Sequence, residues 1–335
     1  MEYISNVKAY INDVLNRIVI TNSNVDDVFL RNMMFIVGIC KIVDIDINKE
    51  RIMNVMKWNV VVKENTFIGF KGNVRSDIED VVSTFIGLAV LRMMNVHIKE
   101  FICMYMNNEG VVYNEDVFIK EVCAYGKGLN GEFRNYKMDE YSEIDIRFTY
   151  CALGCLRLIR NDNDVIMKYL NTNEIVNCIL KYINSYECGW SLTQYGETNC
   201  GLTYCAIASL MLLNYNISSN KQIYVKLVTY LINRITTITG RTNKQSDSCY
   251  SFWVSASLHL LNVSHLINEQ SLTTFISQCS TIFGGFSKHA SSTSPNIHYP
   301  DIMHTYFTLN TLLLINKIPN TKCNVNCILC IPLDK

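Results

Sequence analysis

The chain repeats one short pattern five times, and this repetition constrains its fold more than any other feature of the sequence. In each copy a polar residue is followed, after three variable residues, by Thr or Ser, an aromatic residue and an apolar stretch ending in leucine. The spacing of the copies leaves room in every repeat for this helix, a turn, a second helix and a return loop. A sixth, weaker copy begins near Asp27. The five clear copies are DVVSTFIGLAVL, DIRFTYCALGCL, NCGLTYCAIASL, DSCYSFWVSASL and DIMHTYFTLNTL, which begin at Asp80, Asp145, Asn199, Asp247 and Asp301.

The repeated segments have the properties of buried helices. Each begins with Asp or Asn, whose side-chain oxygen can accept hydrogen bonds from the free amides of a first helical turn. Each is apolar on nearly every face, so it must be covered all round. The segments between them, for example residues 174–186 and 222–235, carry charges on one side and suit an outer layer. Glycine-aromatic turns precede most copies, at Gly69, Gly189 and Gly285.

The repeats predict the fold class. About six helical hairpins with parallel inner helices would give an all-α fold that closes into an α-α toroid. An open solenoid of the same hairpins is the alternative. We expect one toroid domain over residues 1–335, with a short C-terminal extension from about residue 317.

The composition narrows the function. The 30 Lys and Arg residues balance 30 Asp and Glu residues, so there is no excess positive charge for binding a nucleic acid backbone. Apolar residues make up 49% of the chain and charged residues 18%, which indicates a large apolar interior or a surface shared with a partner. No apolar stretch is long enough for a transmembrane segment, and the 14 cysteines lie within apolar runs, as core residues do. These features predict a protein of the reducing cytoplasm.

Three residues of the repeat starts form a candidate metal site. Equivalent positions of a repeat lie at equivalent heights, so the starts of the inner helices share one rim of the toroid. Asp247 and Cys249 lie at one helix start and His304 at the next, and together they offer oxygen, sulfur and nitrogen ligands. Three ligands leave a fourth tetrahedral position open, as catalytic zinc requires. Taken singly they could be a helix cap, a core thiol and a polar rim residue, but their grouping favours zinc.

Positive charge gathers at the same rim. Arg241 and Lys244 lie close before the metal set in the sequence, and the phenol of Tyr250 follows. A forked guanidinium and a compact ammonium together suit a diphosphate. The alternative is an ordinary solvated turn.

Four stretches of the chain closely resemble the β subunits of protein prenyltransferases. The similarity in repeat plan covers about residues 10–316, and the string D-x-C-Y-S-F-W is its most specific part. The stretches are DIRFTYCA at 145–152, GRTNKQSDSCYSFWVSASL at 240–258, GGFSK at 284–288 and PDIMHTYF at 300–307.

This resemblance implies roles for individual residues. Asp247, Cys249 and His304 match the zinc ligands of the family. Arg241, Lys244 and Tyr250 match its diphosphate contacts. Trp253 matches a wall of its isoprenoid pocket, and Arg147 matches the residue near the peptide's C-terminal carboxylate.

One segment departs from the family pattern. Where the family normally has His followed by Gly, this chain has Asn199 and Cys200. Asn can donate a hydrogen bond to a diphosphate but cannot carry a positive charge, so the strength or geometry of binding should differ. A longer loop, residues 289–299, also precedes Pro300.

Several positions relate the chain to the type I geranylgeranyl enzymes of this family. Leu30 lies nearest to a tryptophan that shortens the lipid pocket of the farnesyl enzyme, and Lys288 replaces that enzyme's magnesium-binding Asp. The Rab-modifying enzyme has C-Y-S-W-W instead of C-Y-S-F-W, and an acidic residue in place of Asn243. Apolar Met303 beside His304 favours peptides that end in Leu. The chain therefore resembles the β subunit of protein geranylgeranyltransferase type I most closely.

The resemblance also implies a mechanism and partners. Zinc would hold the cysteine of a C-terminal CaaX motif as thiolate, and the thiolate would attack C1 of geranylgeranyl diphosphate. Arg241, Lys244, Tyr250 and Lys288 would stabilise the departing diphosphate, so magnesium is not expected to be required. The implied partners are an α subunit and CaaX-terminated small GTPases. The alternatives are the β subunit of a farnesyl or Rab enzyme and a non-catalytic binding toroid.

The C-terminal stretch CNVNCILCIPLDK contains three cysteines that could form a second metal cluster. Cys323, Cys327 and Cys330 do not have a familiar zinc spacing, and apolar residues surround them. We therefore expect these thiols to pack in the core.

Overall fold

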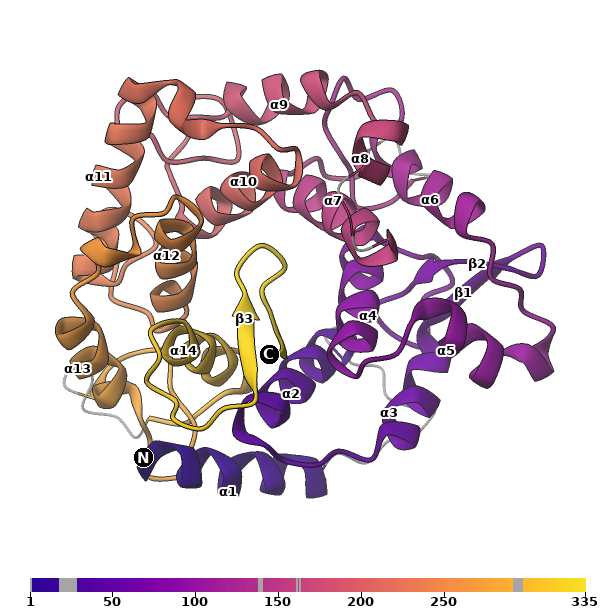
Figure 1. The fold of residues 1–335 in the computed structure, drawn as a ribbon, viewed down its shortest axis with the longest axis horizontal. Coiled ribbons are helices and arrows are strands. Elements are labelled where there is room, and N and C mark those ends of the chain that lie inside the picture. Colours follow the sequence, from indigo (N-terminus) through magenta and orange to yellow (C-terminus); the bar gives the residue numbers. More distant parts are fainter. Residues whose placement is uncertain (1, 18–28, 138–140, 161, 163, 292–297) are drawn as a thin grey trace.

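The computed structural model describes residues 2–17, 29–137, 141–160, 162, 164–291 and 298–335. Within these residues fourteen α-helices form two concentric layers around a central opening (Figure 1). Each inner helix contacts the next, and α14 contacts α2, so the ring is closed. The prediction of an α-α toroid is confirmed, and the open solenoid is excluded. The inner helices are α2 (Phe29–Val43), α4 (Val81–Met93), α7 (Ile146–Arg160), α10 (Cys200–Leu212), α12 (Cys249–Leu260) and α14 (Ile302–Leu314).

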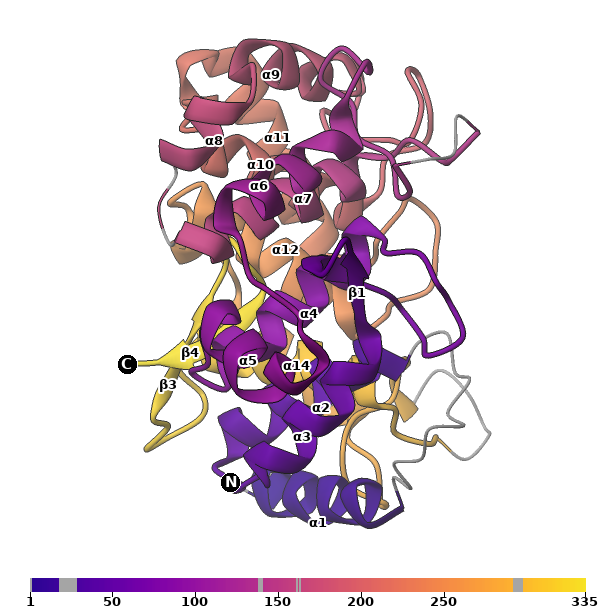
Figure 2. The ribbon, with the colours of Figure 1, turned by 90° about the vertical axis from the view of Figure 1, so that its right-hand side faces the viewer.

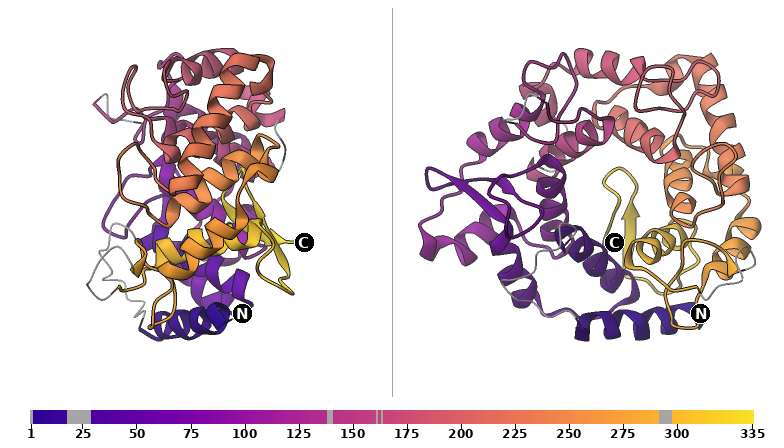
Figure 3. Two further views of the ribbon diagram at one scale, coloured as in Figure 1. Left: turned by 90° about the vertical axis from the view of Figure 1, so that its left-hand side faces the viewer. Right: turned by 180° about the vertical axis from the view of Figure 1, so that it is seen from behind.

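The other helices surround this ring (Figure 3). Helices α9 and α11 overlap the two segments, residues 174–186 and 222–235, for which the charge pattern predicts an outer position. Short 3-10 helices lie at residues 57–59, 107–109, 124–126, 217–219 and 264–266. The outer α-helices are α1 (Glu2–Arg17), α3 (Lys49–Met56), α5 (Ile98–Tyr105), α6 (Glu115–Cys123), α8 (Asp164–Tyr169), α9 (Thr172–Lys181), α11 (Lys221–Thr237) and α13 (Glu269–Cys279).

The inner helices are buried on almost every face, as their sequences predict. In α10, eleven of the thirteen residues are buried. Small residues allow neighbouring inner helices to approach closely. A Cβ atom at Gly154 of α7 would lie 2.6 Å from the ring of Phe85 in α4, so only glycine fits there.

Three of the inner helices, α4, α10 and α14, are joined to the preceding turn by the same hydrogen bonds. The aromatic residue of the glycine-aromatic turn donates its backbone N–H to the hydroxyl of the Thr in the repeat. Its carbonyl accepts the backbone N–H of the Asp or Asn that opens the repeat. These bonds explain why the repeat carries Thr, and they join Phe70 to Thr84 and Asp80, Trp190 to Thr203 and Asn199, and Phe286 to Thr305 and Asp301.

The residues that open the repeats accept backbone N–H groups at the helix starts. Asp80, Asn199 and Asp301 are the N-caps of α4, α10 and α14. Asp145 and Asp247 accept the N–H two residues later, although α12 begins only after Ser248. The sixth copy's Asp27 lies outside the described residues, as do residues 292–297 of the long loop before Pro300.

Two short antiparallel hairpins accompany the helices, and the sequence analysis predicts neither. Strands β1 (Val60–Lys63) and β2 (Thr66–Phe70) pair on the outside of the ring. Strands β3 (Cys323–Asn326) and β4 (Ile331–Asp334) form a hairpin that enters the central opening (Figure 1). This hairpin lies on the face opposite to the long loops that precede the inner helices (Figure 2).

No single helix in the described part of the chain is long and apolar enough to cross a membrane. Helices α4 and α5 reach the required length and apolarity only when taken together, with a 90° bend between them. Because α4 is a buried helix of the inner ring, its apolar composition is explained by the toroid itself.

Candidate functional site

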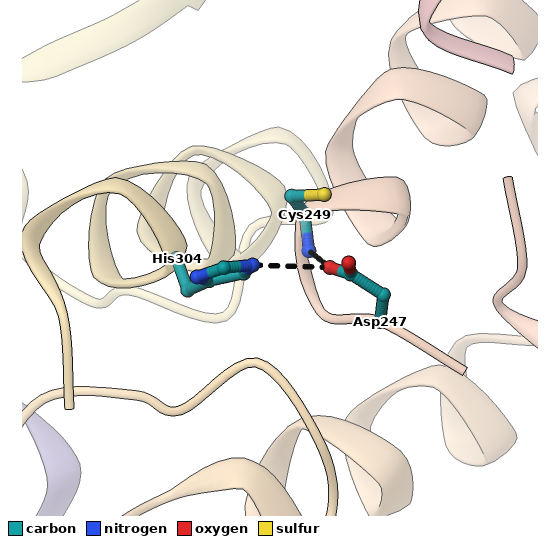
Figure 4. A group of neighbouring side chains, drawn as sticks. All are labelled: Asp247, Cys249 and His304. Carbon is teal, nitrogen blue, oxygen red and sulfur yellow. Dashed lines mark hydrogen bonds and ion pairs between the residues drawn. The ribbon is translucent and has the colours of Figure 1, made fainter. Parts of the chain in front are cut away.

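Asp247, Cys249 and His304 come together at the rim where α12 and α14 begin. Cys249 is the first residue of α12, Asp247 lies in the turn before it, and His304 is in the first turn of α14. One ligand atom from each lies within 4.8 Å of the others, and all three residues are buried. The side chains face one another in Figure 4, with Nε2 of His304 3.2 Å from Oδ1 of Asp247. Among the described residues this is the one group with the donors for a metal ion.

The atoms of this group fit a zinc ion. Nε2 of His304 is buried and lies 3.2 Å from Oδ1 of Asp247, so the nitrogen and the oxygen face the same space, where both could bind one ion. Oxygen, sulfur and nitrogen donors in a set of three are typical of catalytic zinc sites, in which an exogenous ligand takes the fourth position. Asp247, Cys249 and His304 could therefore hold the metal without rearrangement of the helices that carry them.

The protonation of the group follows from its burial and its carboxylates. Burial would raise the pKa of Asp247, but its contacts with His304 and Cys249 hold the pKa below its usual value. Burial, and then the charge of Asp247, raise the pKa of the Cys249 thiol. Burial lowers the pKa of His304, yet Asp247 and Asp301 outweigh it and raise the pKa to about 9. Without metal, the thiol of Cys249 is therefore protonated at neutral pH, and the ring of His304 is a positively charged imidazolium.

Asp301 contacts His304 directly, although the sequence analysis places it on the rim without assigning it to the metal site. Its Oδ1 caps α14 by accepting the backbone N–H of His304, and its Oδ2 lies 2.5 Å from Nδ1 of the same residue. The carboxylate therefore fixes the imidazole so that Nε2 faces Asp247, as carboxylates do behind many histidine ligands of zinc. The sequence contains one signal for this contact, because a capping Asp three residues before a ligand His lies within reach of the imidazole.

A pocket of about 630 Å³ opens between the starts of α10 and α12. It brings together five residues that the sequence analysis assigns to substrate binding: Arg147, Asn199, Arg241, Tyr250 and Trp253. The rest of the lining combines apolar residues with glycine, one threonine, one cysteine and one acid, namely Leu192, Thr193, Gly196, Glu197, Gly201, Leu202 and Cys205.

Three predicted residues lie outside the lining of this pocket. Lys288 is half exposed, and its Nζ lies 3.7 Å from Oδ2 of Asp247, so it is next to the metal-ligand group. Met303 precedes His304 at the rim and is 36% exposed. Lys244 is an exposed residue of the loop between Arg241 and Asp247.

The polar side chains of the pocket are held by specific contacts. Oδ1 of Asn199 accepts the N–H of Gly201, so its amide group is directed toward the hydroxyl of Tyr250, 3.5 Å away. The ring of Tyr250 lies against Gly240, where an added Cβ would be 1.9 Å from it. Gly240 is therefore required for this orientation of the phenol.

Both arginines of the pocket have acidic partners that the sequence analysis did not identify. Arg241 forms an ion pair of 3.0 Å with Glu197, two residues before Asn199. Arg147 forms a hydrogen-bonded ion pair with buried Asp145 and lies 3.8 Å from Glu143. These carboxylates orient the guanidinium groups, and an anionic substrate would have to share them.

The cysteines of the C-terminal stretch pack as expected. Cys323, Cys327 and Cys330 are buried, and in the described part of the chain they form no metal-ligand group. All 14 cysteines are free thiols.

Comparison with known proteins agrees with this arrangement. The family model described as the prenyltransferase alpha-alpha toroid domain matches residues 4–331. The chain is 34% identical over 186 residues to the geranylgeranyl transferase type-1 subunit beta of Arabidopsis thaliana, covering 52% of this chain and 46% of that protein. It is 33% identical over 190 residues to the same subunit of Dictyostelium discoideum, covering 56% and 49%. The chain thus spans about half the length of the curated relatives it matches.

Other relatives and a solved structure complete the comparison. Beta subunits of a type-2 geranylgeranyl transferase and of a protein farnesyltransferase also match. The structure of Candida albicans protein geranylgeranyltransferase-I complexed with GGPP superimposes with a TM-score of 0.75 at 24% identity, covering 98% of this chain and 95% of that chain, and so shows the shared fold. By its repeats, its closed ring and the match along nearly its whole length, the chain belongs to the prenyltransferase α-α toroid family.

Proposed function

We propose that the chain is the catalytic β subunit of a zinc-dependent protein geranylgeranyltransferase of type I. It would transfer a geranylgeranyl group from geranylgeranyl diphosphate to the cysteine of a C-terminal CaaX motif. The observation that carries this proposal is the group formed by Asp247, Cys249 and His304 beside a pocket with cationic and apolar walls. Similarity to two type-1 beta subunits supports the choice of enzyme.

The metal-ligand group would prepare the acceptor. Zinc, when bound, supplies a Lewis acid that keeps a cysteine thiol deprotonated at neutral pH. The ionised carboxylate of Asp247 contributes the negative ligand, and Asp301 orients the imidazole of His304. These residues would hold the acceptor sulfur at the rim, next to the pocket proposed for the lipid diphosphate.

The cationic side of the pocket would stabilise the leaving group. In the reaction a bond forms between the acceptor sulfur and C1 of the lipid, and the bond between C1 and the diphosphate oxygen breaks with its electron pair. The negative charge that develops on the diphosphate would be matched by Arg241 in the pocket, by Lys244 and Lys288 outside its lining, and by hydrogen bonds from Tyr250 and Asn199. The N-termini of α10 and α12 face the same region and favour an anion.

The remaining wall would bind the organic parts of the substrates. Trp253, Leu202 and Cys205 present apolar surface for the isoprenoid chain. Arg147 would contact the terminal carboxylate of the peptide, with Asp145 holding the guanidinium in place. Met303 at the rim would favour an apolar final residue of the peptide.

The chain would act together with an α subunit. Both type-1 relatives are named as beta subunits, and the charged fraction of only 18% fits a surface that is partly covered by a partner. Sedimentation of the chain expressed alone and with candidate α subunits tests this point. A chain that is monomeric and fully active alone would contradict it.

The function is tested by prenyl transfer with the co-expressed heterodimer. We expect kcat/KM for geranylgeranyl transfer to peptides ending in Leu or Phe to exceed kcat/KM for farnesyl transfer to peptides ending in Ser or Met. The reversed order would place the chain with the farnesyl enzymes. Transfer to Rab proteins but not to CaaX peptides would place it with the type-2 enzymes.

A further inference from the structure

Two loops carry polar residues of the pocket proposed for the diphosphate. The first loop, residues 184–198, leads into Asn199 at the start of α10. The second loop, residues 239–246, carries Arg241 and leads into Asp247 of the metal-ligand group. The position of one loop relative to the other therefore sets the distance between the amide of Asn199 and the guanidinium of Arg241.

One carboxylate outside the pocket connects these loops. Glu187 of the first loop accepts hydrogen bonds from two hydroxyl groups, that of Thr198 in its own loop and, at 2.8 Å, that of Thr242 in the second loop. Thr198 directly precedes Asn199 in the sequence, and Thr242 directly follows Arg241. Each of these two residues proposed to contact the diphosphate therefore has a neighbour that is bound to the same carboxylate.

Arg234 of the outer helix α11 balances the charge of this carboxylate. Its Nη2 donates to the hydroxyl oxygen of Thr242 at 2.9 Å and lies 3.6 Å from Oε1 of Glu187. The guanidinium also lies over the ring of Tyr230, 5.3 Å from the ring centroid, and the side chain is only 13% exposed. A carboxylate that is paired in this way can hold the loops together without repelling an anion bound nearby.

A second contact between the loops lies within the pocket and differs in this respect. Arg241 and Glu197, which form an ion pair of 3.0 Å, both line the pocket. A diphosphate in the pocket would compete with Glu197 for the guanidinium, so substrate binding would weaken this contact. Glu187, Thr198 and Thr242 are not part of the lining, so their hydrogen bonds can persist when the pocket is filled.

The base of the second loop is fixed by backbone hydrogen bonds. The carbonyl of Ile238 accepts the N–H of Asp247, and the carbonyl of Gly240 accepts the N–H of Cys200, each at 3.0 Å. Ile238 has a φ of 51°, a left-handed backbone that is strained for a β-branched residue and persists only where surrounding contacts impose it. The tip of the loop is attached by side chains, among them that of Thr242.

We propose that Glu187 is a positioning residue of the diphosphate site. By binding both threonines it keeps Asn199 and Arg241 at the separation that one diphosphate group requires. The inference rests on the proposed function and adds a residue that itself touches no substrate. It concerns the anionic part of the substrate, because Trp253 and Cys205 of the apolar wall belong to the inner helices α12 and α10 and not to the loops.

The test uses the full heterodimer and two inhibitors, inorganic diphosphate and geranylgeraniol, which has the lipid chain without the charge. Glu187→Ala should weaken inhibition by inorganic diphosphate about tenfold and lower kcat/KM for the lipid diphosphate about 10–100-fold, because the two loops are no longer held at one distance. Thr242→Val should act in the same direction, about tenfold, and should add little to Glu187→Ala in the double variant. Zinc content and inhibition by geranylgeraniol should stay within about twofold of the wild type.

Two threonine variants separate positioning from general damage. Thr242→Ser keeps the hydroxyl and should bind inorganic diphosphate within about twofold of the wild type. Thr229→Val should do the same, because it removes an exposed hydroxyl of α11 that bonds the carbonyl of Val225 in its own helix.

Three outcomes would contradict the positioning role. They are wild-type binding of inorganic diphosphate by Thr242→Val, equal weakening of both inhibitors by Glu187→Ala, and a Thr242→Ser variant that is as weak as Thr242→Val. Because Thr242 is exposed, its variants decide the question if Glu187→Ala does not fold. A wild-type heterodimer that neither binds diphosphate nor transfers the lipid would instead overturn the proposed function.

Discussion

The two ends of the ring differ in chemistry, although the same inner helices build both. Where the helices begin, free N–H groups and the positive ends of the helix dipoles face the metal-ligand group and its pocket. Where they end, Lys41 donates to the carbonyl of Met93 at the end of α4 and forms an ion pair with Asp334 of the hairpin. Because the inner helices are parallel, the end of the ring where they begin is suited to anions. The end where they finish contacts the C-terminal hairpin of the same chain.

The ends also differ in how buried polar atoms are satisfied. At the rim, the partner of buried Nε2 of His304 is Oδ1 of Asp247 at 3.2 Å, so two atoms that could bind a metal contact each other. In the turn of the hairpin, the carbonyls of Cys327, Ile328 and Cys330 all receive tyrosine hydroxyls. An unpaired buried polar atom costs about 1–3 kcal/mol. The tyrosine hydroxyls therefore stabilise the fold at the second end, whereas at the first end a bound metal would replace the contact between His304 and Asp247.

The largest expected effect comes from removing a ligand at the rim. Cys249→Ala should abolish zinc binding. Loss of a residue that only orients a metal ligand lowers activity about 10–100-fold, and loss of the ligand itself should lower transfer by more than that. Helix content and Tm should stay near the wild-type values, because the hairpin end is untouched. Zinc content by mass spectrometry and a prenyl transfer assay measure both effects, with exposed Cys103→Ala as the control. Wild-type protein without stoichiometric zinc under reducing conditions would contradict the site assignment.

Zinc binding should weaken steeply as pH falls. The raised pKa values of Cys249 and of His304, about 9 for the latter, mean that metal uptake near neutral pH releases a proton from each. Release of two protons makes the apparent affinity fall about 100-fold for each unit of decreasing pH. A competition titration against a chelator between pH 6 and 8 measures the slope. An affinity that does not change over this range would show that the metal is bound elsewhere.

The charge of Lys288 should matter for the leaving group. Lys288→Asp should slow transfer about 100-fold without magnesium, because one donor to the departing diphosphate is lost. Millimolar magnesium should restore part of the rate, since the new carboxylate supplies a hard oxygen ligand. Lys221→Asp, an exposed change on α11, is the matched control. A wild type that is already strongly accelerated by magnesium would rule out this role for Lys288.

Removal of the carboxylate behind His304 should have a smaller effect. Asp301→Asn keeps an oxygen that can cap α14 but loses the charge beside Nδ1, so zinc affinity should fall about 10–100-fold. The helix should remain intact, which circular dichroism can verify. Unchanged zinc affinity would mean that Asp301 acts only as a cap.

The smallest effect on catalysis is expected at the hairpin end. Tyr306→Phe leaves the carbonyl of Cys330 without its donor, which should lower the free energy of unfolding by about 1–3 kcal/mol. Zinc affinity should not change, because the hydroxyl of Tyr306 bonds the hairpin and not the metal-ligand group. Exposed Tyr299→Phe should change stability by less than about 0.5 kcal/mol. A loss of zinc in Tyr306→Phe would show that the ends are coupled.

The repeat predicts the inner helices well because each is specified locally, by a cap, an apolar stretch and a Thr that bonds the preceding turn. The hairpin could not be predicted in this way. Its turn contains Cys330 with a φ of 57°, an unusual backbone for a cysteine, and is held by hydroxyls from distant helices. The metal-ligand group could be predicted because its residues lie at equivalent positions of the repeat. The ion pair of Arg241 with Glu197 could not, because it depends on how two loops are arranged in space.

Closure of the ring has a consequence for how the protein is synthesised. Phe35 of α2 packs against Tyr306 of α14, with ring centroids 5.0 Å apart, so the first and last inner helices touch although about 270 residues separate them. During translation, α2 cannot contact its second neighbour in the ring until α14 has left the ribosome. Until then both edges of the growing arc expose apolar helix faces. The nascent chain therefore needs protection from aggregation late in translation, and folding finishes only after the last repeat is made.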